Sequence, residues 1–377
     1  MSPVRDLVEI GMGRTARRSY DLQQIEIVPS RRTRSSKEVT LGWQLDAYRF
    51  EIPLMTHPTD AVVSPASAVR IGQLGGLPVL NAEGLWARHG DADAALERVL
   101  DAADTGDESA AIRLLQELHA APIQPDLLAE ALKTVREAGV TVAVRVSPQR
   151  AREITPTLLA AGVEILVVQG TIISAEHVSQ GEPLNLGEFI MGLDVPVVAG
   201  GVGDYRTAMH LMRTGAAGVI VGYGESTGTT TDAVLGIGVP MATAIVDAAA
   251  ARRDYLDETG GRYVHVIADG GMAGSGDMAK AIACGADAVM LGEQLAASSE
   301  SPAGGLYWTS SAAHPALPRS EITVQDTGDR TLEQVLFGPS DSPYGDVALF
   351  SALRRAMAKT GYSDLKEFQK AGLTVRG

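Results

Sequence analysis

The chain has 377 residues, of which 45% are apolar, a formal net charge of −14 at pH 7 and one cysteine. The strong negative charge argues against non-specific nucleic-acid binding, in which Lys and Arg neutralise phosphates. One cysteine excludes an intrachain disulfide, and no apolar run approaches the roughly 20 residues of a membrane span. We therefore expect a cytoplasmic protein with neither a nucleic-acid nor a membrane partner.

Residues 1–51 are predicted to form an N-terminal arm that precedes the main domain. The arm contains one extended stretch, Ile25–Pro29, and the one basic region of the chain, Arg14 to Lys37. Isolated charge runs of this kind are usually solvated. The basic region is therefore interpreted as a solvated face or a subunit contact.

Eight short apolar runs follow, with helical patterns between them, which is typical of βα units and a parallel sheet. The runs are continuous, as expected for strands that are buried on both faces. They are Ile52–Thr56, Leu77–Ala82, Val140–Val146, Glu164–Gln169, Val195–Gly201, Gly218–Tyr223, His265–Gly270 and Asp287–Gly292. Eight such strands predict an α/β fold of the (β/α)8 TIM-barrel type with its core at residues 52–298, in preference to an open doubly wound sheet.

The helical patterns predict the outer layer of this barrel. The predicted helices are Ser64–Leu74, Ala110–Ala138, Arg150–Ala161, Tyr205–Thr214, Met241–Thr259 and Asp277–Cys284. Five junctions between a helix and the next strand carry a glycine that suits a helix end. Those glycines are Gly75, Gly139, Gly162, Gly215 and Gly285.

The last region, residues 299–377, is predicted to complete the barrel domain. Residues 299–344 are rich in Ser, Pro, Gly and Asp, which predicts a long and largely irregular loop. Two helices, Val347–Thr360 and Asp364–Ala371, are predicted to follow. Long loops of this kind in compact domains are usually functional or mobile.

The ends of the seventh and eighth strands carry the clearest sign of a ligand. Asp269-Gly270-Gly271 follows one apolar run and Gly292 ends the next. Glycine lets backbone N–H groups approach a ligand closely, and barrels commonly hold phosphate on these two loops. The sequence therefore predicts a phosphorylated small-molecule ligand. The loop after strand 6, from Gly222 to Asp232, is rich in Gly and hydroxyl residues and is predicted to bind a ligand or a cation.

These segments, together with Val239-Pro240-Met241 and Ile52-Pro53-Leu54, resemble the IMP dehydrogenase/GMP reductase family. The chain most closely resembles the short actinobacterial branch that lacks the regulatory (CBS) domains. The resemblance implies a barrel, usually a homotetramer, that binds a purine nucleotide of the IMP or GMP class. A helical segment of about 50 residues stands where other family members insert their regulatory domains.

The resemblance also implies roles for particular residues. Nucleotide contacts are implied at Thr227, Asp269, Gly270, Gly271 and Gly292, with Asp269 holding the ribose hydroxyls and Thr227, Gly271 and Gly292 facing the phosphate. The backbone carbonyls of Gly222 and Gly224 match a monovalent-cation site. The cofactor that the family implies is NAD(P), and Gln169 and Gly201 stand where its nicotinamide half is received.

The sequence departs from the family where the chemistry takes place. Thr229 stands at the position of the catalytic cysteine, and a hydroxyl needs an adjacent base to become nucleophilic. Gln169 replaces an Asp, Gly201 replaces an Asn, and Glu293 replaces a phosphate-binding Ser, where a carboxylate would repel phosphate. The Arg-Tyr pair that activates water is not recognisable in residues 299–344. The cysteine of the chain, Cys284, is expected to be a buried apolar residue.

Three functions remain open from the sequence. The first is an NAD(P)-dependent oxidoreductase that acts on purine nucleotides through Thr229 or a substrate-assisted route. The second is a non-catalytic nucleotide-binding protein that regulates, or assembles with, an active paralogue. The third is an unrelated barrel activity with His57, His177 and Glu293 as acid/base groups. We favour nucleotide binding over turnover, because the binding residues are retained while the catalytic ones are changed.

Overall fold

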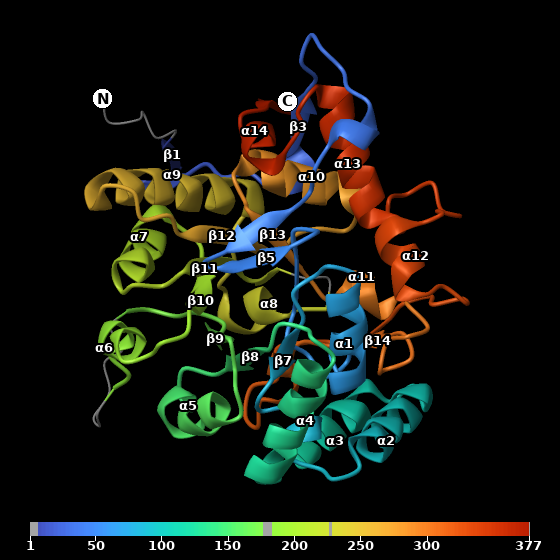
Figure 1. Ribbon diagram of the computed structural model, residues 1–377. Helices are drawn as coiled ribbons and strands as arrows, with labels where there is room; N and C mark the ends of the chain where they lie inside the picture. The colour runs from blue at the N-terminus through green and yellow to red at the C-terminus, as the bar shows by residue number, and fades with distance from the viewer. Residues whose placement is uncertain (1–6, 176–182, 226–227, 377) are drawn as a thin grey trace.

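The computed structural model describes residues 7–175, 183–225 and 228–376. Its centre is a barrel of eight parallel strands (Figure 1). The strands are β6 (Leu54–Thr56), β7 (Val79–Asn81), β8 (Ala143–Val146), β9 (Ile165–Gln169), β10 (Val197–Val202), β11 (Gly218–Glu225), β12 (His265–Gly270) and β13 (Ala288–Leu291). Their spatial order is β6-β13-β12-β11-β10-β9-β8-β7, and a parallel bridge between Met55 and Leu77 joins the two outer strands. The predicted (β/α)8 barrel is confirmed.

The strands form where the sequence is continuously apolar. All five residues of β9 and all four of β13 are buried, as parallel strands covered by helices on one face and by the barrel interior on the other require. The five predicted junction glycines all have positive φ angles. This backbone conformation is strained for any residue with a Cβ, so glycine ends each helix and turns the chain into the next strand.

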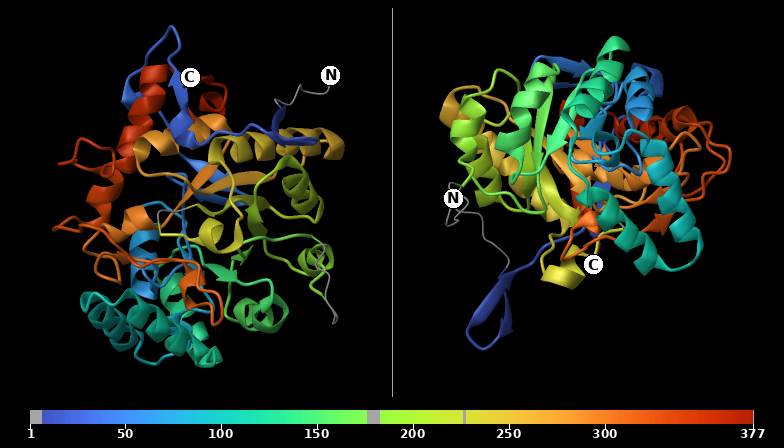
Figure 2. Two further views of the ribbon diagram at one scale, coloured as in Figure 1. Left: turned by 180° about the vertical axis from the view of Figure 1, so that it is seen from behind. Right: turned by 90° about the horizontal axis from the view of Figure 1, so that it is seen from below.

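Helices surround the barrel (Figures 1 and 2). Those that follow strands in the chain are α1 (Pro65–Gln73), α5 (Ala151–Ala160), α6 (Leu186–Met191), α7 (Tyr205–Arg213), α8 (Thr231–Leu235), α9 (Met241–Thr259), α10 (Ser275–Cys284) and α11 (Glu293–Ala296). The long helix α9 packs against α7 on one side and α10 on the other. No helix among the described residues has the length and apolar content needed to cross a membrane.

The prediction of a single helix over Ala110–Ala138 is wrong. The segment after β7 instead folds into three helices, α2 (Ala92–Asp104), α3 (Glu108–Ala120) and α4 (Pro125–Glu137). Proline explains the break, because the residue before Pro122 is driven out of the helical region, and Ala121 accordingly has φ −60° and ψ 146°. Pro125 then occupies the first turn of α4, where its missing N–H costs nothing.

The described part of the predicted N-terminal arm, residues 7–51, contributes strands to three small two-stranded sheets. Strands β1 (Leu7–Gly11) and β2 (Arg14–Arg17) form a hairpin that stands clear of the barrel (Figure 2). Strand β3 (Ile25–Val28) pairs antiparallel with the C-terminal strand β16 (Gly372–Val375). A second hairpin, β4 (Trp43–Leu45) with β5 (Tyr48–Phe50), lies at the amino ends of the barrel strands, where the Trp43 ring lies 6.3 Å from that of His265.

The region 299–344 is more ordered than its composition predicts. It contains β14 (Leu306–Tyr307), β15 (Thr323–Val324), a 3-10 turn at Ser310–Ala313 and helix α12 (Leu332–Phe337). Tyr307 and Trp308 are among the most fully buried large side chains of the protein. This loop therefore folds back onto the barrel. Helices α13 (Leu349–Thr360) and α14 (Leu365–Phe368) follow it.

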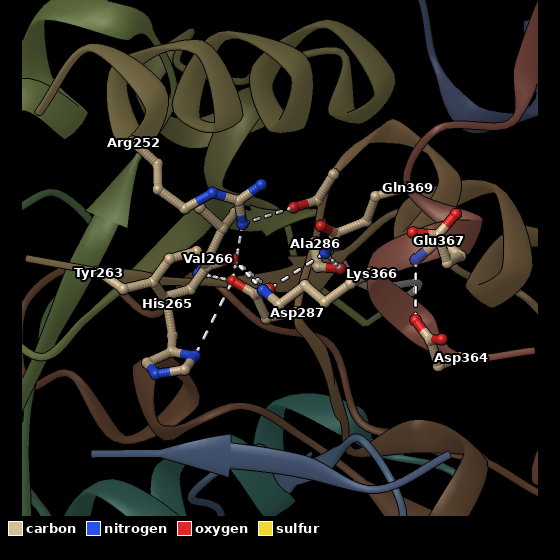
Figure 3. Close-up of polar contacts among 11 residues, drawn as sticks. Arg252, Tyr263, His265, Val266, Ala286, Asp287, Asp364, Lys366, Glu367 and Gln369 are labelled. Atoms are coloured by element: carbon tan, nitrogen blue, oxygen red, sulfur yellow. Dashed lines mark hydrogen bonds and ion pairs between the residues drawn. The ribbon is translucent and has the colours of Figure 1, made fainter. Parts of the chain in front are cut away.

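A buried charge network at the amino end of the barrel attaches the C-terminal segment (Figure 3). At its centre is the carboxylate of Asp287, which is 3% exposed. It is contacted by Arg252 NH1 at 2.7 Å, the Tyr263 hydroxyl at 2.8 Å, Lys366 Nζ at 2.5 Å, Gln369 Nε2 at 3.0 Å and the Val266 amide at 2.8 Å. Removal of Asp287 would leave Arg252 and Lys366 without their counter-charge, so this carboxylate holds α9 and the α14 segment to the barrel.

Candidate functional site

Two cavities lie at the carboxyl ends of the barrel strands, and they share the side chains of His57 and Asp269. The smaller one, of about 290 Å³, is lined by Gly270, Gly271 and Gly292, and we call it the glycine cavity. The larger one, of about 540 Å³, lies over β7–β11 and the C-terminal loop, and we call it the arginine cavity. This end of a barrel is where enzymes of this architecture place their active sites.

Asp269 stands where the two cavities meet. Its Oδ1 lies 3.2 Å from His57 Nδ1, and its Oδ2 accepts a hydrogen bond of 2.9 Å from Gln169 Nε2. All three side chains are buried. A ring nitrogen that faces a carboxylate carries the proton, so His57 Nδ1 donates to Asp269. The carboxylate is thereby fixed in orientation, and each of its oxygens retains a lone pair for a ligand hydroxyl.

The glycines of the smaller cavity are needed by the protein's own packing as well as by any ligand. A Cβ at Gly292 would lie 2.7 Å from the Tyr307 ring and 3.0 Å from Cβ of His57. A Cβ at Gly271 would lie 2.7 Å from Cγ of Met241, and Gly271 has a φ of +71°. Gly271 and Gly292 are therefore required in part because neighbouring side chains of the protein pack closely against them.

Thr229 lies at the edge of the arginine cavity without a base. Its Oγ1 contacts Oγ1 of Thr231 at 3.1 Å and donates to the backbone carbonyl of Arg319 at 3.3 Å. A bridge between Thr229 and Ser320 pairs this loop with the C-terminal loop. No carboxylate, imidazole or amine contacts the hydroxyl among the described residues, so nothing here activates it as a nucleophile.

Cys284 does not replace the missing thiolate. It ends α10, is 6% exposed, and lines neither cavity. Burial raises the pKa of its thiol to about 12. The expectation of a buried apolar cysteine agrees with this environment.

The residues at the positions for the nicotinamide half of a cofactor do not fit that role. Gln169 carries no charge, and its Nε2 already donates a hydrogen bond to Asp269 Oδ2. A side chain at Gly201 would meet the Gly222 carbonyl oxygen at 1.9 Å, so that position has no space for one. Gly222 and Gly224 line the arginine cavity from β11. No group of three or more His, Cys, Asp or Glu side chains suited to a metal ion occurs in the described parts of the chain.

The arginine cavity contains three arginines that sequence reasoning missed, namely Arg88, Arg145 and Arg319. Arg145 projects from β8 and donates to the Gln169 carbonyl at 2.8 Å, with Glu83 Oε1 3.5 Å from its NH1. Burial lowers the pKa of Arg145. An arginine between two valines of a buried strand, Val144-Arg145-Val146, is the sequence signal that could have identified it.

Arg319 reaches the cavity from the C-terminal loop. Its NH1 donates to the Leu317 carbonyl at 2.9 Å and its NH2 to Thr171 Oγ1 at 3.2 Å. Its Nε is buried and has no hydrogen-bond partner among the residues that the structure describes. Burial lowers the pKa of Arg319, and no carboxylate within the described residues lies close enough to form an ion pair with it. No local sequence pattern marks this residue, because its position depends on the path of a long loop.

Glu293 lines the glycine cavity, as its place after Gly292 predicts. Its Oε1 accepts a hydrogen bond of 2.8 Å from Gln325 Nε2. Two of the residues singled out in the sequence, Thr227 and His177, lie outside the described residues.

Comparison with known proteins identifies relatives along the whole chain. Residues 19–314 match the profile of the IMP dehydrogenase / GMP reductase domain. An uncharacterized oxidoreductase of Mycolicibacterium smegmatis is 67% identical over 373 residues, which cover 98% of this chain and 100% of that protein. One from Mycobacterium tuberculosis is 66% identical over 375 residues, with the same coverage. The crystal structure of an IMP dehydrogenase/GMP reductase-like protein from Corynebacterium glutamicum superposes with a TM-score of 0.94 at 57% identity, covering 98% of each chain.

Proposed function

We propose that this chain, which belongs to the IMP dehydrogenase / GMP reductase family, binds a purine nucleotide of the IMP or GMP class across its two joined cavities. The observation that carries the proposal is the position of Asp269, a buried and oriented carboxylate at the junction of two cavities. Such a carboxylate suits a pair of vicinal ribose hydroxyls, each of which donates one hydrogen bond. The base and the phosphate then extend to opposite sides of the ribose.

Gly270, Gly271 and Gly292 allow the ligand to lie close to the backbone on one side of Asp269. In the orientation that the family resemblance implies, the phosphate lies on that side, at Gly271 and Gly292, and the base lies toward β11. Polar side chains of the arginine cavity then surround the base. Gln169 presents a buried Oε1 that has no hydrogen-bond partner in the described part of the chain, which suits an N–H donor of the ligand.

We propose that the chain does not oxidise IMP by the thiolate route of its family. The hydroxyl of Thr229 contacts no base among the described residues, and Cys284 lines neither cavity. We therefore propose that the chain binds a nucleotide without oxidising it. A protein of this kind can act as a nucleotide-responsive regulator or as an assembly partner of an active paralogue.

An apolar hairpin supports the assembly part of this proposal. In β1 and the turn that follows, Leu7, Ile10 and Met12 are 59%, 65% and 102% exposed, although the hairpin itself is regularly paired. Exposed apolar side chains on a projecting arm suit burial against another chain. We propose that further copies of this chain, in the homotetramer that the family implies, provide that surface.

Calorimetric titration of the full chain with IMP and GMP tests the nucleotide proposal. Dissociation constants in the micromolar range are expected, which correspond to about −8 kcal/mol. Absence of heat at millimolar IMP and GMP would refute the proposal. Light scattering coupled to size-exclusion chromatography measures the molar mass and so tests the proposed homotetramer. A single species with the mass of one chain would contradict it.

A further inference from the structure

The glycine cavity offers hydrogen-bond donors to a phosphate, but its charged groups oppose one. The backbone N–H groups of Gly271 and Gly292 have no acceptor among the described residues, so they are available to an anion. The carboxylates of Asp21, Asp269 and Glu293 line the same cavity, and none of its described lining residues is Lys or Arg. A phosphomonoester carries a charge of about −1.5 to −2 at pH 7, so its binding calls for a positive group that backbone amides do not supply.

His57 is the one basic side chain among the described residues that line this cavity. The point where a Cβ of Gly292 would stand lies 3.0 Å from Cβ of His57 and 2.8 Å from the hydroxyl oxygen of Tyr307. The histidine therefore packs directly beside the glycine that the phosphate is proposed to approach. Its Nδ1 lies 3.2 Å from Oδ1 of Asp269, while its Nε2 forms no hydrogen bond with a described residue and is free to contact a ligand.

Other charged groups surround His57, and none of them brings a cation to the glycine cavity. Asp60, on the same segment, lies 3.1 Å from Nε2 of His119 on α3. Lys280 of α10 lies 3.7 Å from Asp277 and 3.8 Å from Glu26, and it does not line the cavity. The arginine cavity, which His57 also lines, holds the charged side chains of Glu83, Arg88, Arg145 and Arg319.

We infer, on the basis of the proposed function, that His57 supplies the positive charge for the phosphate through a proton that its Nε2 takes up when the phosphate binds. The oxygens of a phosphate dianion only accept hydrogen bonds, so Nε2 must carry a proton to contact one. Nδ1 keeps its own proton toward Asp269, and the ring becomes an imidazolium whose charge offsets that of Glu293. The proton comes from the solvent, and no other covalent bond is made or broken.

Coupling between the proton and the phosphate gives the site a response to pH. Histidine side chains are mostly neutral at pH 7.5, so IMP binding takes up a proton there. Inosine has the same base and ribose without the phosphate, and its binding takes up none. By linkage, the affinity for IMP relative to inosine falls as the pH rises, by about tenfold per pH unit when one proton is taken up.

Calorimetry at pH 7.5 in two buffers with different enthalpies of protonation, PIPES and imidazole, counts the protons taken up. The wild-type protein is expected to take up about one proton per IMP and none per inosine. His57→Asn keeps an amide N–H for Asp269 and removes Nε2. It is expected to take up no proton and to lose at least about tenfold in the ratio of IMP to inosine affinity. His57→Gln, with a neutral N–H near the Nε2 position, should retain part of this ratio without proton uptake.

His210→Asn is the matched control, because His210 is an exposed histidine of α7 that lines neither cavity. It is expected to match the wild type in both the proton count and the affinity ratio. Addition of Glu293→Gln to His57→Asn is expected to restore part of the ratio, because it removes the carboxylate that the imidazolium offsets. Equal thermal unfolding midpoints show that folded proteins are compared.

Wild-type binding of IMP without proton uptake would overturn the inference, and this measurement requires no variant. Proton uptake that persists in His57→Asn would overturn it as well, since the proton would then reside on another group. If neither IMP nor inosine binds the wild-type protein, the purine proposal fails. Sulfate, a dianion that takes up no proton itself at this pH, then tests His57 alone. Sulfate binding with a proton uptake that is lost in His57→Asn still supports the role of the histidine, and any other result refutes it.

Discussion

Nδ1 of His57 lies 3.2 Å from Oδ1 of Asp269, at the one place where the two cavities of the site meet. The histidine follows β6 and the aspartate lies in β12, so residues from opposite ends of the barrel sequence fix one carboxylate. Gln169 fixes the other oxygen from β9. Binding of a ribose at this carboxylate is therefore sensitive to its charge but requires no large rearrangement of the site.

Replacement of Asp269 by Asn keeps the shape and removes the charge. We expect IMP and inosine to lose about 1.5–3 kcal/mol of binding free energy, the range for a hydrogen bond to a charged group. Calorimetry measures the loss. Glu130→Gln, an exposed change on α4, is the control and should bind like the wild type. Unchanged binding by Asp269→Asn would place the nucleotide elsewhere.

Introduction of the family nucleophile by Thr229→Cys is expected to give no NADH from IMP and NAD+ above the wild-type level. A thiol at this position has no base among the described residues, and the residues for the nicotinamide half do not fit. Absorbance at 340 nm follows the reaction, with Thr229→Ser as control. Steady NADH production by the cysteine variant alone would contradict the assignment of the site as unable to oxidise.

The thiol of Cys284 is expected to be inert in the folded protein. Its pKa is raised to about 12 by burial, so almost no thiolate exists at pH 8. Ellman's reagent should label no thiol in the native chain and one per chain after denaturation. Thr229→Cys provides the positive control, because it should add one reactive thiol in the native state. Rapid labelling of the native wild-type protein would contradict this burial.

Acid should destabilise the protein in two stages through the network around Asp287. Burial lowers the pKa of His265 below its ordinary 6.5. The unfolded chain therefore takes up this proton first, and stability declines as the pH falls below about 6.5. Burial alone would raise the pKa of Asp287, but Arg252 and Lys366 hold it well below its ordinary 3.8. This second contribution is present above about pH 4 and is lost as the pH falls further.

Asp287→Asn tests the second stage. At pH 7 the variant should lose about 3–5 kcal/mol of unfolding free energy, because it leaves Arg252 and Lys366 without their counter-charge. The difference from the wild type should shrink below pH 4. Urea unfolding at several pH values measures it, and Asp341→Asn, at an exposed ion pair with Arg330, is the control. A constant difference down to pH 3 would show that charge is not the cause.

The barrel strands could be predicted from the sequence because parallel strands that are buried on both faces consist of continuous runs of apolar residues. The five junction glycines, from Gly75 to Gly285, marked the helix ends because each has a positive φ angle, which other residues adopt only with strain. The segment between β7 and β8 was harder to predict. Its helical composition continues across Ala121, and only the two prolines show where one helix ends and the next begins.

The site was only partly predictable for a different reason. Asp269 and the glycines lie at strand ends, so the fold alone brings them together. Arg319 and Tyr307 enter from a loop whose course depends on tertiary contacts such as the Thr229–Ser320 bridge. Composition marked that loop as irregular and gave no indication of which side chain it presents to the cavity.

The pairing of β3 with β16 has a topological consequence. Val375 lies opposite Ile25 in an antiparallel pair, at a Cα separation of about 5 Å, so the domain closes on itself near both ends of its sequence. A short linker from 375 to 25, with new termini at the exposed Gly106 between α2 and α3, would leave every barrel strand with its present neighbours. Apart from the β1–β2 hairpin, the domain should therefore tolerate circular permutation.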